Sequence, residues 1–332
     1  MNIKTIVQAL EEGAPPEYQE SYDNAGLIAG DPQWEAKSAV LCLDATEAVV
    51  DEAIALGSNL IIAHHPIVFR PLKRFNGKNY VERTLIKAIK NDVAIYAAHT
   101  NLDNVFHQGV NGAIAKRLGL LDTRILAPKQ VWKKMSIRLP ETKQTLAKEA
   151  LIPFRGIRAD WMSEGRVEIV CQQAQQFSVQ AALEEALKQP LFAEVFPLES
   201  PTADVGSGMI GRLPSPLEET AFLRQVKEKM NAAVIRHTAL RNKPIEKVAV
   251  CGGSGGFLLP HAIAQGADVF VTADYKYHEF FDAEGRILIA DIGHFESEQF
   301  TIELFYEILS EKFPNFALHC TKVNTNPVHY FV

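Results

Sequence analysis

Short runs of apolar residues alternate along the chain with stretches in which apolar residues recur every three or four positions. The second pattern begins at once, with apolar residues at positions 3, 6, 7 and 10, and predicts a helix. Similar spacing predicts helices over Glu47–Leu56, Asn79–Asn91 and Glu298–Lys312. The apolar runs predict strands over Ala39–Leu43, Leu60–Ala63, Val93–Ala97, Lys247–Val250, Val269–Thr272 and Ile287–Ala290. This alternation is typical of β-α-β units and predicts an α/β fold with a largely parallel sheet.

The sequence also repeats itself. Ala53-Ile-Ala-Leu-Gly57 returns 209 positions later as Ala262-Ile-Ala-Gln-Gly266. The following strand ends correspond at a slightly different spacing, since His99-Thr-Asn-Leu-Asp103 resembles His294-Phe-Glu-Ser-Glu298. In both of these segments a histidine precedes a carboxylate by four residues. Because the matches keep the same order, they predict two related α/β halves that face each other.

A region with a different pattern separates the two halves. Between about residues 128 and 202, the pattern predicts strand, helix, strand, helix and strand over Trp132–Leu139, Lys143–Ala150, Arg166–Cys171, Ser178–Lys188 and Ala193–Pro197. Two β-α-β passes in so short a span indicate a small ferredoxin-like α+β module. We therefore predict a first half over 1–127, an inserted module over 128–202 and a second half over 203–332.

Composition narrows the class of protein. The 332 residues carry a formal net charge of −6, which disfavours a non-specific grip on nucleic-acid phosphates. No apolar run approaches the ~20 residues of a membrane-spanning helix, and the acidic residues after the first predicted helix do not fit a signal peptide. The four cysteines are far apart, so buried thiols in a reducing compartment are expected. These features predict a cytoplasmic protein with no nucleic-acid or membrane partner.

Two adjacent histidines follow one of the predicted strands. His64 and His65 come directly after Leu60–Ala63, and Pro66 favours an extended backbone at His65. Side chains at the carboxyl end of such a strand lie at the edge of an α/β sheet where ligands bind. Neutral imidazole is a common ligand for zinc-type metals. The pair therefore favours metal binding over two histidines that merely cap a strand.

Two later strand ends each carry a histidine and a carboxylate. His99 and Asp103 follow the third predicted strand, where Asp103 could equally be a turn or capping residue before a helix near Gly109–Leu118. His294 and Glu298 follow the last predicted strand. Residues four apart share one face of a helix, so this second pair can hold one ion.

Together the strand ends supply more donors than one ion needs. The predicted ligand set is His64, His65, Asp103, His294 and Glu298, with His99 in reserve. A single zinc-type ion needs only three or four protein ligands. Five or six, including carboxylates that can bridge, suit two divalent ions about 3.5–4 Å apart. The mixed nitrogen and oxygen donors fit zinc, iron, manganese or cobalt and disfavour calcium.

Other segments could take part in chemistry near the same edge. Cys251-Gly-Gly-Ser-Gly-Gly256 could aim backbone N–H groups at an anion, although a tight turn explains it equally well. Asp274 and His278 lie in a polar segment after a predicted strand. With His99, they are candidates for proton transfer, substrate contact or support of metal ligands, or they are ordinary loop residues.

In its polar motifs the chain resembles the NIF-three-like family, whose members are often labelled GTP cyclohydrolase type 2 homologues. The matching segments occur in family order and span nearly the whole chain outside the insert: Tyr22-Asp-Asn-Ala-Gly-Leu27, His64-His-Pro-Ile-Val-Phe69, His99-Thr-Asn-Leu-Asp103, Gly253-Ser-Gly-Gly256, Thr272-Ala-Asp-Tyr-Lys-Tyr-His278 and Asp291-Ile-Gly-His-Phe-Glu-Ser-Glu298. Tyr22 stands where the family usually has tryptophan, and Ala273 replaces a common glycine.

The resemblance implies an architecture and an activity. It implies a dinuclear metal centre on the five predicted ligands, a PII- or CutA-like insert, and a toroid of six subunits with metal sites facing an inner cavity. One functional hypothesis is a metal-dependent hydrolase, GTP cyclohydrolase-like, that acts on a nucleotide or another phosphate-containing small molecule. The alternative is a non-enzymatic metal-handling protein or regulatory scaffold. Open coordination positions would favour the enzyme, since a structural site is usually closed.

Overall fold

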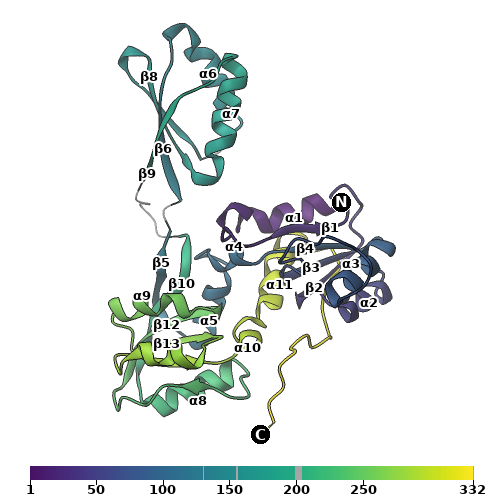
Figure 1. Cartoon of the computed structure of the whole chain (residues 1–332), viewed down its shortest axis with the longest axis vertical. Helices are drawn as coiled ribbons and strands as arrows, with labels where there is room; N and C mark the ends of the chain where they lie inside the picture. The colour runs from purple at the N-terminus through teal and green to yellow at the C-terminus, as the bar shows by residue number, and fades with distance from the viewer. Residues whose placement is uncertain (130, 155, 199–203, 332) are drawn as a thin grey trace. The chain divides into compact units, whose positions relative to one another are not determined.

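The chain folds into two compact units. The computed structural model describes residues 1–129, 131–154, 156–198 and 204–331. Met1–Pro128 and Gly206–Val332 form one unit, here called the core unit, and Lys129–Val205 form the other, the insert unit (Figure 1). The predicted boundary between 202 and 203 lies outside the described residues. Of the helices that the structure describes, none is long and apolar enough to cross a membrane.

The first sheet of the core unit has five strands in the order β1-β4-β3-β2-β15. They are β1 (Gly26–Ala29), β2 (Ala39–Asp44), β3 (Leu60–His65), β4 (Ala94–Ala97) and β15 (Leu318–Cys320). All run parallel except β1, which pairs antiparallel with β4. Helices α2 (Glu47–Ala55) and α3 (Tyr80–Lys90) cover one face, and α1 (Ile3–Glu11) and α11 (Thr301–Lys312) cover the other. Because β2 and β3 are covered on both faces, they are apolar at nearly every position.

The second sheet has six strands in the order β11-β14-β13-β12-β10-β5. They are β5 (Leu121–Pro128), β10 (Gly206–Leu217), β11 (Arg236–His237), β12 (Ile245–Ser254), β13 (Val269–Ala273) and β14 (Leu288–Asp291). Strands β12, β13 and β14 are parallel, and the other pairs are antiparallel. Helix α9 (Leu259–Ala264) packs on one face, and α5 (Val110–Leu118) and α8 (Glu219–Lys229) pack on the other.

The internal repeat is visible in the strand register. Ala39 pairs with Leu60 between β2 and β3, and Val248 pairs with Val269, each 209 positions later, between β12 and β13. In each sheet the last of three consecutive parallel strands pairs with an antiparallel strand. This strand is β1 beside β4 in the first sheet and β11 beside β14 in the second. The predicted α/β fold class is therefore confirmed. The sheets also exchange segments, because β5 lies in the second sheet and the C-terminal β15 lies in the first.

Most predicted elements form close to their expected bounds, with one helix corrected. Instead of one helix over Glu298–Lys312, α10 (His294–Glu298) ends where that helix was predicted to begin, and α11 starts at Thr301. Phe305 and neighbouring apolar residues of α11 pack in the core, whereas α10 presents polar side chains to the centre described below. The break between the two helices allows these two orientations.

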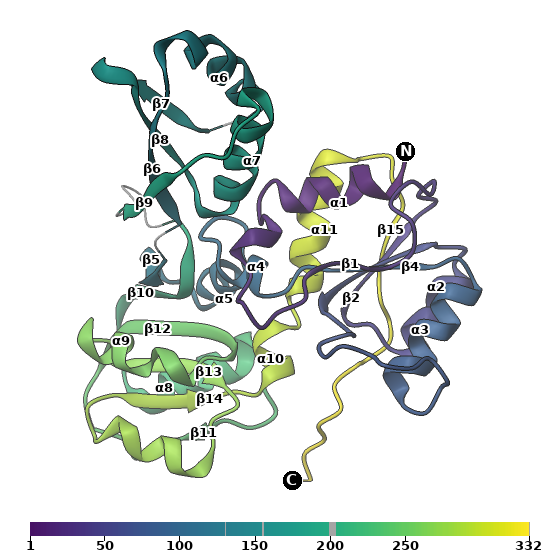
Figure 2. The same ribbon diagram turned by 45° about the horizontal axis from the view of Figure 1, so that its top comes forward.

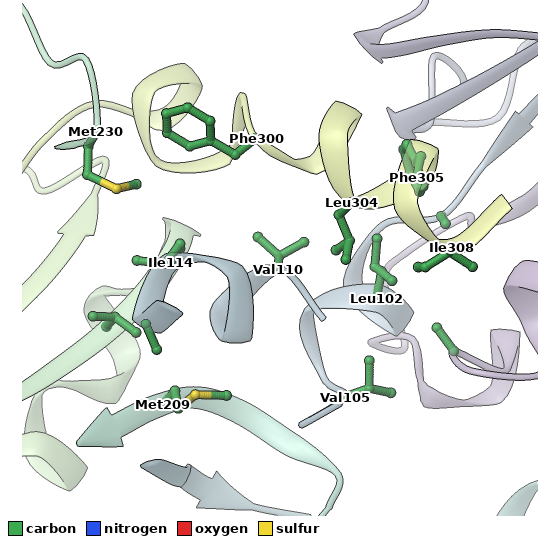
Figure 3. Close-up of a cluster of buried hydrophobic side chains, with 14 of the residues drawn as sticks. Leu102, Val105, Val110, Ile114, Met209, Met230, Phe300, Leu304, Phe305 and Ile308 are labelled. Atoms are coloured by element: carbon green, nitrogen blue, oxygen red, sulfur yellow. The ribbon is translucent and has the colours of Figure 1, made fainter. Parts of the chain in front are cut away.

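One hydrophobic core joins the two halves of the core unit. Val110 and Ile114 of α5 belong to the same buried cluster as Leu304 and Phe305 of α11. Figure 3 shows Leu304 pointing toward Val110. Helices α5 and α10 lie where the two halves meet (Figure 2). Since this core fixes both sheets, it also fixes the strand ends of one half against those of the other.

The insert unit has its own sheet and core. Its strands β6 (Trp132–Arg138), β7 (Arg158–Trp161), β8 (Arg166–Gln172) and β9 (Ala193–Leu198) form an antiparallel sheet in the order β7-β8-β6-β9. With α6 (Gln144–Leu151) and α7 (Gln176–Leu187), the element order is β-α-β-β-α-β. The pattern-based prediction missed β7, which has four residues, none of them fully buried.

Candidate metal centre

Three strand ends of the core unit bring polar side chains together. His64 and His65 are the last residues of β3. His99 follows β4, and Asp103 ends the short helix α4 (Thr100–Asp103). The loop after β14 turns at Gly293, whose φ is +95°, and leads into α10, which carries the remaining pair of predicted ligands, His294 and Glu298. All five predicted ligands and His99 thus lie at one place, with donor atoms contributed by both halves.

Each of the four histidines is oriented by a partner on its Nδ1 atom. In each ring the Nδ1–H group donates to an oxygen 2.7–2.8 Å away. His64 donates to the backbone carbonyl of Ala98. The other three donate to carboxylates: His65 to Asp44, His99 to Asp23 and His294 to Asp274. This arrangement leaves Nε2 of each ring as the atom that faces the other histidines and carboxylates. Histidines that bind metal ions almost always donate their other ring N–H in this way.

Glu298 lies at the middle of the cluster. Its side chain is 2% exposed, and its Oε2 atom lies 2.9 Å from His65 Nε2 and 3.0 Å from His294 Nε2. The same oxygen lies 3.7 Å from His64 Nε2. Nitrogen atoms Nε2 of His65 and His294 are 3.3 Å apart. Ligand atoms that share one zinc-type ion at bond lengths of roughly 2.0–2.2 Å are separated by similar distances.

Two buried polar atoms of the cluster have no hydrogen-bond partner among the described residues. They are Nε2 of His64 and Oδ1 of Asp103, which lie 3.6 Å from each other. A buried polar atom without a partner costs free energy, so native proteins rarely retain one without a role. A metal ion would satisfy both atoms at once, since an imidazole nitrogen and a carboxylate oxygen are ordinary ligands.

The donors form three overlapping groups that could hold an ion. In each group one ligand atom from every residue lies within 4.8 Å of the others: His64 with His65 and His99, His65 with His294 and Glu298, and His64 with Asp103 and Glu298. Because His64, His65 and Glu298 each belong to two groups, neighbouring ions would share ligands. The residues therefore fit a metal centre, and their number exceeds the need of one ion.

Without metal, hydrogen-bonded carboxylates keep the central histidines protonated. Burial lowers the pKa of His65, but its bonds to Asp44 and Glu298 outweigh burial and raise it to about 9. Burial also lowers the pKa of His294, yet the charge of Glu298 and the bond to Asp274 raise it to about 11. The positive charge that a metal ion would bring is thus supplied by protons on the same nitrogens.

The pKa values of the two carboxyl groups of the centre are shifted in opposite directions. Burial, together with the charge of Glu298, raises the pKa of Asp103 to about 8. Burial acts in the same direction on Glu298, but the charge of His294 overcomes it and holds the pKa of Glu298 well below its ordinary value. In the metal-free protein, Glu298 therefore keeps its charge at neutral pH, whereas Asp103 binds a proton more readily than an ordinary aspartate.

Metal binding should release protons and should tighten as the pH rises. His65 and His294 bind protons below pKa values of about 9 and 11, and a metal ion must displace these protons from Nε2. We expect apparent affinity for Mn²⁺ or Co²⁺ to keep rising between pH 6.5 and pH 9, where unshifted histidines would already have levelled off. Calorimetric titration at pH 7 in two buffers of different ionisation enthalpy measures the protons released. Binding with no proton release would contradict these protonation states.

The glycine-rich segment after β12 packs against Glu298 and is already hydrogen bonded. The N–H groups of Gly252, Gly253 and Gly255 donate to side-chain oxygens of Asn111, Ser297 and Thr272. A Cβ atom at Gly253 would lie 2.5 Å from Oε1 of Glu298, and φ at this residue is +59°. These contacts favour the tight turn over an anion-binding loop. The glycine allows the backbone to approach the central carboxylate.

Of the other two candidate residues, Asp274 lies at the centre and His278 does not. Asp274 orients His294, and its carboxylate also lines the cavity beside the centre. His278 is exposed in the 3₁₀ helix after β13, where its ring contacts that of Tyr277. Sequence reasoning missed Asp23 and Asp44 as partners of histidines. Asp44 could have been found by the same rule as His65, since it ends the neighbouring parallel strand.

The centre opens into a cavity of about 860 Å³. Ligand sites for small molecules have volumes of this order. The C-terminal segment after β15 forms part of its wall and is tied to both halves. Thr325 donates to Oδ2 of Asp44 over 2.6 Å, and Asn326 donates to Oε1 of Glu296 over 3.3 Å. The ligand groups therefore have access to a volume that a small molecule can occupy.

Comparisons with known proteins agree with this fold. A model of the family described as Duf34/NIF3 (NGG1p interacting factor 3) matches residues 1–327. The chain is 32% identical to a Halalkalibacterium halodurans protein named GTP cyclohydrolase 1 type 2 homolog, over 98% of each chain. It is 30% identical to a Bacillus subtilis protein of the same name, over 89% of this chain and 88% of that one.

Solved structures give the same result. A Bacillus cereus protein related to NIF3 is 31% identical, with a TM-score of 0.76 over 100% of this chain and 99% of that one. A Staphylococcus aureus protein is 28% identical, with a TM-score of 0.80 over the same shares. The resemblance inferred from the motifs is confirmed: the chain belongs to the Duf34/NIF3 family.

Proposed function

We propose that this protein holds two divalent metal ions between the halves of its core unit. The ligands would be the five residues predicted from sequence, His64, His65, Asp103, His294 and Glu298. Three overlapping donor groups and two partnerless buried atoms support this proposal. Zinc, iron, manganese and cobalt all suit these donors.

We infer that the centre serves a hydrolase. The observation that carries this inference is the cavity, which is lined by His65, His99, His294 and Glu298 and would give a small molecule access to the ions. A structural site would be closed by protein ligands. Bound divalent ions lower the pKa of a coordinated water and polarise the bond to be hydrolysed. His99 and Asp274 line the same cavity and are the candidates for proton transfer.

The substrate class follows from the relatives and from the chemistry of the proposed ions. Curated relatives carry the name GTP cyclohydrolase 1 type 2 homolog. Divalent ions bind phosphate oxygens well, so we propose a nucleotide or another phosphate-containing small molecule as substrate. A cytoplasmic location and assembly into a homo-oligomer, a toroid of six subunits by family resemblance, complete the proposal.

Metal content and turnover measured on the same preparations test this function. Elemental analysis of the full chain, purified without added metal and then reconstituted with Zn²⁺, Mn²⁺, Co²⁺ or Fe²⁺, should give about two ions per chain. The same samples should hydrolyse GTP or generic phosphoesters, and His64→Ala should abolish turnover. His278→Ala is the matched control, because His278 is exposed and lies outside the donor groups.

The possible outcomes separate the hypotheses. Two ions without turnover of any substrate would favour the non-enzymatic metal-handling or scaffold role. Absence of metal even after reconstitution would refute the dinuclear centre itself.

A further inference from the structure

Aromatic side chains are exposed on the cavity wall beside the metal centre. Tyr22 is 62% exposed and Phe69 is 48% exposed, although both rings belong to the cavity lining. Their centroids lie 6.2 Å apart, and Phe69 is 6.3 Å from His99. Two neighbouring exposed aromatic rings are costly to leave in water, so their position in a cavity points to a ligand.

The second half of the core unit contributes aromatic rings to the same cavity. Phe257 follows the glycine-rich segment and is 61% exposed, and Phe295 is the residue after His294. Tyr330 from the C-terminal segment also lines the cavity. Aromatic rings from both halves therefore surround the space in front of the metal ligands. Such walls suit a planar aromatic ring, because any ring with a π-face can stack on aromatic side chains whatever its substituents.

The charges on the cavity wall are mostly negative. Seven carboxylate side chains line it, from Glu20, Asp44, Asp103, Asp274, Asp291, Glu296 and Glu298. Among the described lining residues Arg236 is the one arginine, with no lysine. Two divalent ions would add four positive charges, so carboxylates would still outnumber positive charges. A ligand with several negative charges would be repelled by this wall.

The groups that could bind a polyphosphate chain are already occupied. Arg236 donates to a carboxylate oxygen of Asp291 and to the backbone oxygen of Tyr275. In the glycine-rich segment, the N–H groups of Gly252, Gly253 and Gly255 donate to side chains. Polyphosphate sites normally rely on such a loop and on free cationic side chains. The proposed ions are therefore the main positive groups available to an anion here.

We propose that the cavity binds a planar heteroaromatic ring against Tyr22 and Phe69 and admits at most one phosphate group, which lies at the metal centre. This inference rests on the proposed metal centre and narrows its substrate class. It favours a nucleoside monophosphate or a similar heterocyclic monoanion or dianion over a nucleoside triphosphate. The ring supplies affinity through stacking, and the acidic wall excludes a longer phosphate chain.

Binding of four probes to the metal-loaded full chain tests the proposal. The probes are AMP, adenosine, ribose 5-phosphate, and ATP supplied as its magnesium complex so that it does not remove metal from the protein. AMP should bind about tenfold more tightly than ribose 5-phosphate, because one stacked base is worth that much. AMP should also bind more tightly than adenosine and more tightly than ATP. Isothermal titration calorimetry measures all four.

Variants of the aromatic wall separate stacking from phosphate binding. Tyr22→Ala and Phe69→Ala should each weaken AMP binding about tenfold while leaving ribose 5-phosphate binding unchanged. Phe281→Ala is the control, because Phe281 is 64% exposed in the core unit but does not line this cavity. Tyr22→Phe should retain AMP binding, since it keeps the ring.

Several results would overturn the proposal. Binding of ATP as tight as that of AMP or tighter, equal binding of AMP and ribose 5-phosphate, or no binding of any probe would each do so. Metal content and phosphoester turnover are measured separately. A metal-loaded, active protein that fails the ring test would therefore refute the ring site and leave the proposed hydrolase standing.

Discussion

Glu298→Gln is expected to cause the largest loss of metal binding of any single substitution in this chain. Oε2 of Glu298 lies within 3.0 Å of Nε2 of both His65 and His294, and the residue belongs to two of the three donor groups. Loss of an outer partner of a ligand typically costs roughly 10–100-fold in metal affinity, and loss of a shared ligand should exceed this range. Elemental analysis after dialysis should find at most one ion per chain.

The matched control lies two residues earlier on the same helix. Glu296 is also buried, at 6% exposed, and undergoes the same chemical change in Glu296→Gln, but it bonds to Asn326 and lies outside the donor groups. This variant should keep both ions. Equal metal content in the two variants would remove Glu298 from the ligand set. Circular dichroism of both proteins separates a lost ligand from a lost fold.

Much of the site could be predicted because it depends on local order along the chain. Apolar runs identify parallel strands, and parallel strands bring their carboxyl ends to one edge. His64 and His65 at the end of β3, and His294 shortly after β14, follow directly from this rule. The repeated spacing of histidine and carboxylate then indicates that both halves contribute. No long-range contact was needed for this inference.

Contacts between distant segments could not be predicted in the same way. His99 is oriented by Asp23, which lies 76 positions earlier in an irregular segment. Strand β10 was missed because it contains Gly206, Gly208, Gly211, Pro214 and Pro216, residues that normally argue against a strand. Its pairing with both β5 and β12 outweighs these local preferences. Local propensity is a weak guide where neighbouring strands supply the hydrogen bonds.

The repeat explains why the two halves contribute different groups. Asp44 and His65 end β2 and β3, and the residues 209 positions later are Gly253 and Asp274. In the first half Asp44 supports the adjacent His65, whereas in the second half Asp274, at the position equivalent to His65, supports His294 from the next strand end. Gly253, at the position equivalent to Asp44, leaves space that the side chain of Glu298 occupies. Related positions have thus taken complementary roles around one centre.

Gly253→Ala should therefore damage the metal centre without changing any ligand. The added Cβ atom would lie 2.5 Å from Oε1 and 3.3 Å from Cδ of Glu298, and both contacts are shorter than a real Cβ makes without displacement of a neighbour. Since Glu298 is buried beside Gly252 and His294, its carboxylate has little space to move. We expect metal affinity to fall roughly 10–100-fold, as for other groups that orient a ligand. Chelator competition monitored with Co²⁺ measures this loss.

A control with the same backbone conformation separates this contact from backbone strain. Gly253 has a φ of +59°, so alanine there also costs about 1–2 kcal/mol of folding free energy. Gly57 has a φ of +69° but no atom within 4 Å of an added Cβ. Gly57→Ala should thus lose similar stability in urea unfolding of the metal-free protein, yet retain normal metal affinity. Equal affinity of both variants for Co²⁺ would show that Gly253 has no part in positioning Glu298, and the close approach of the glycine segment would then be a feature of chain packing alone.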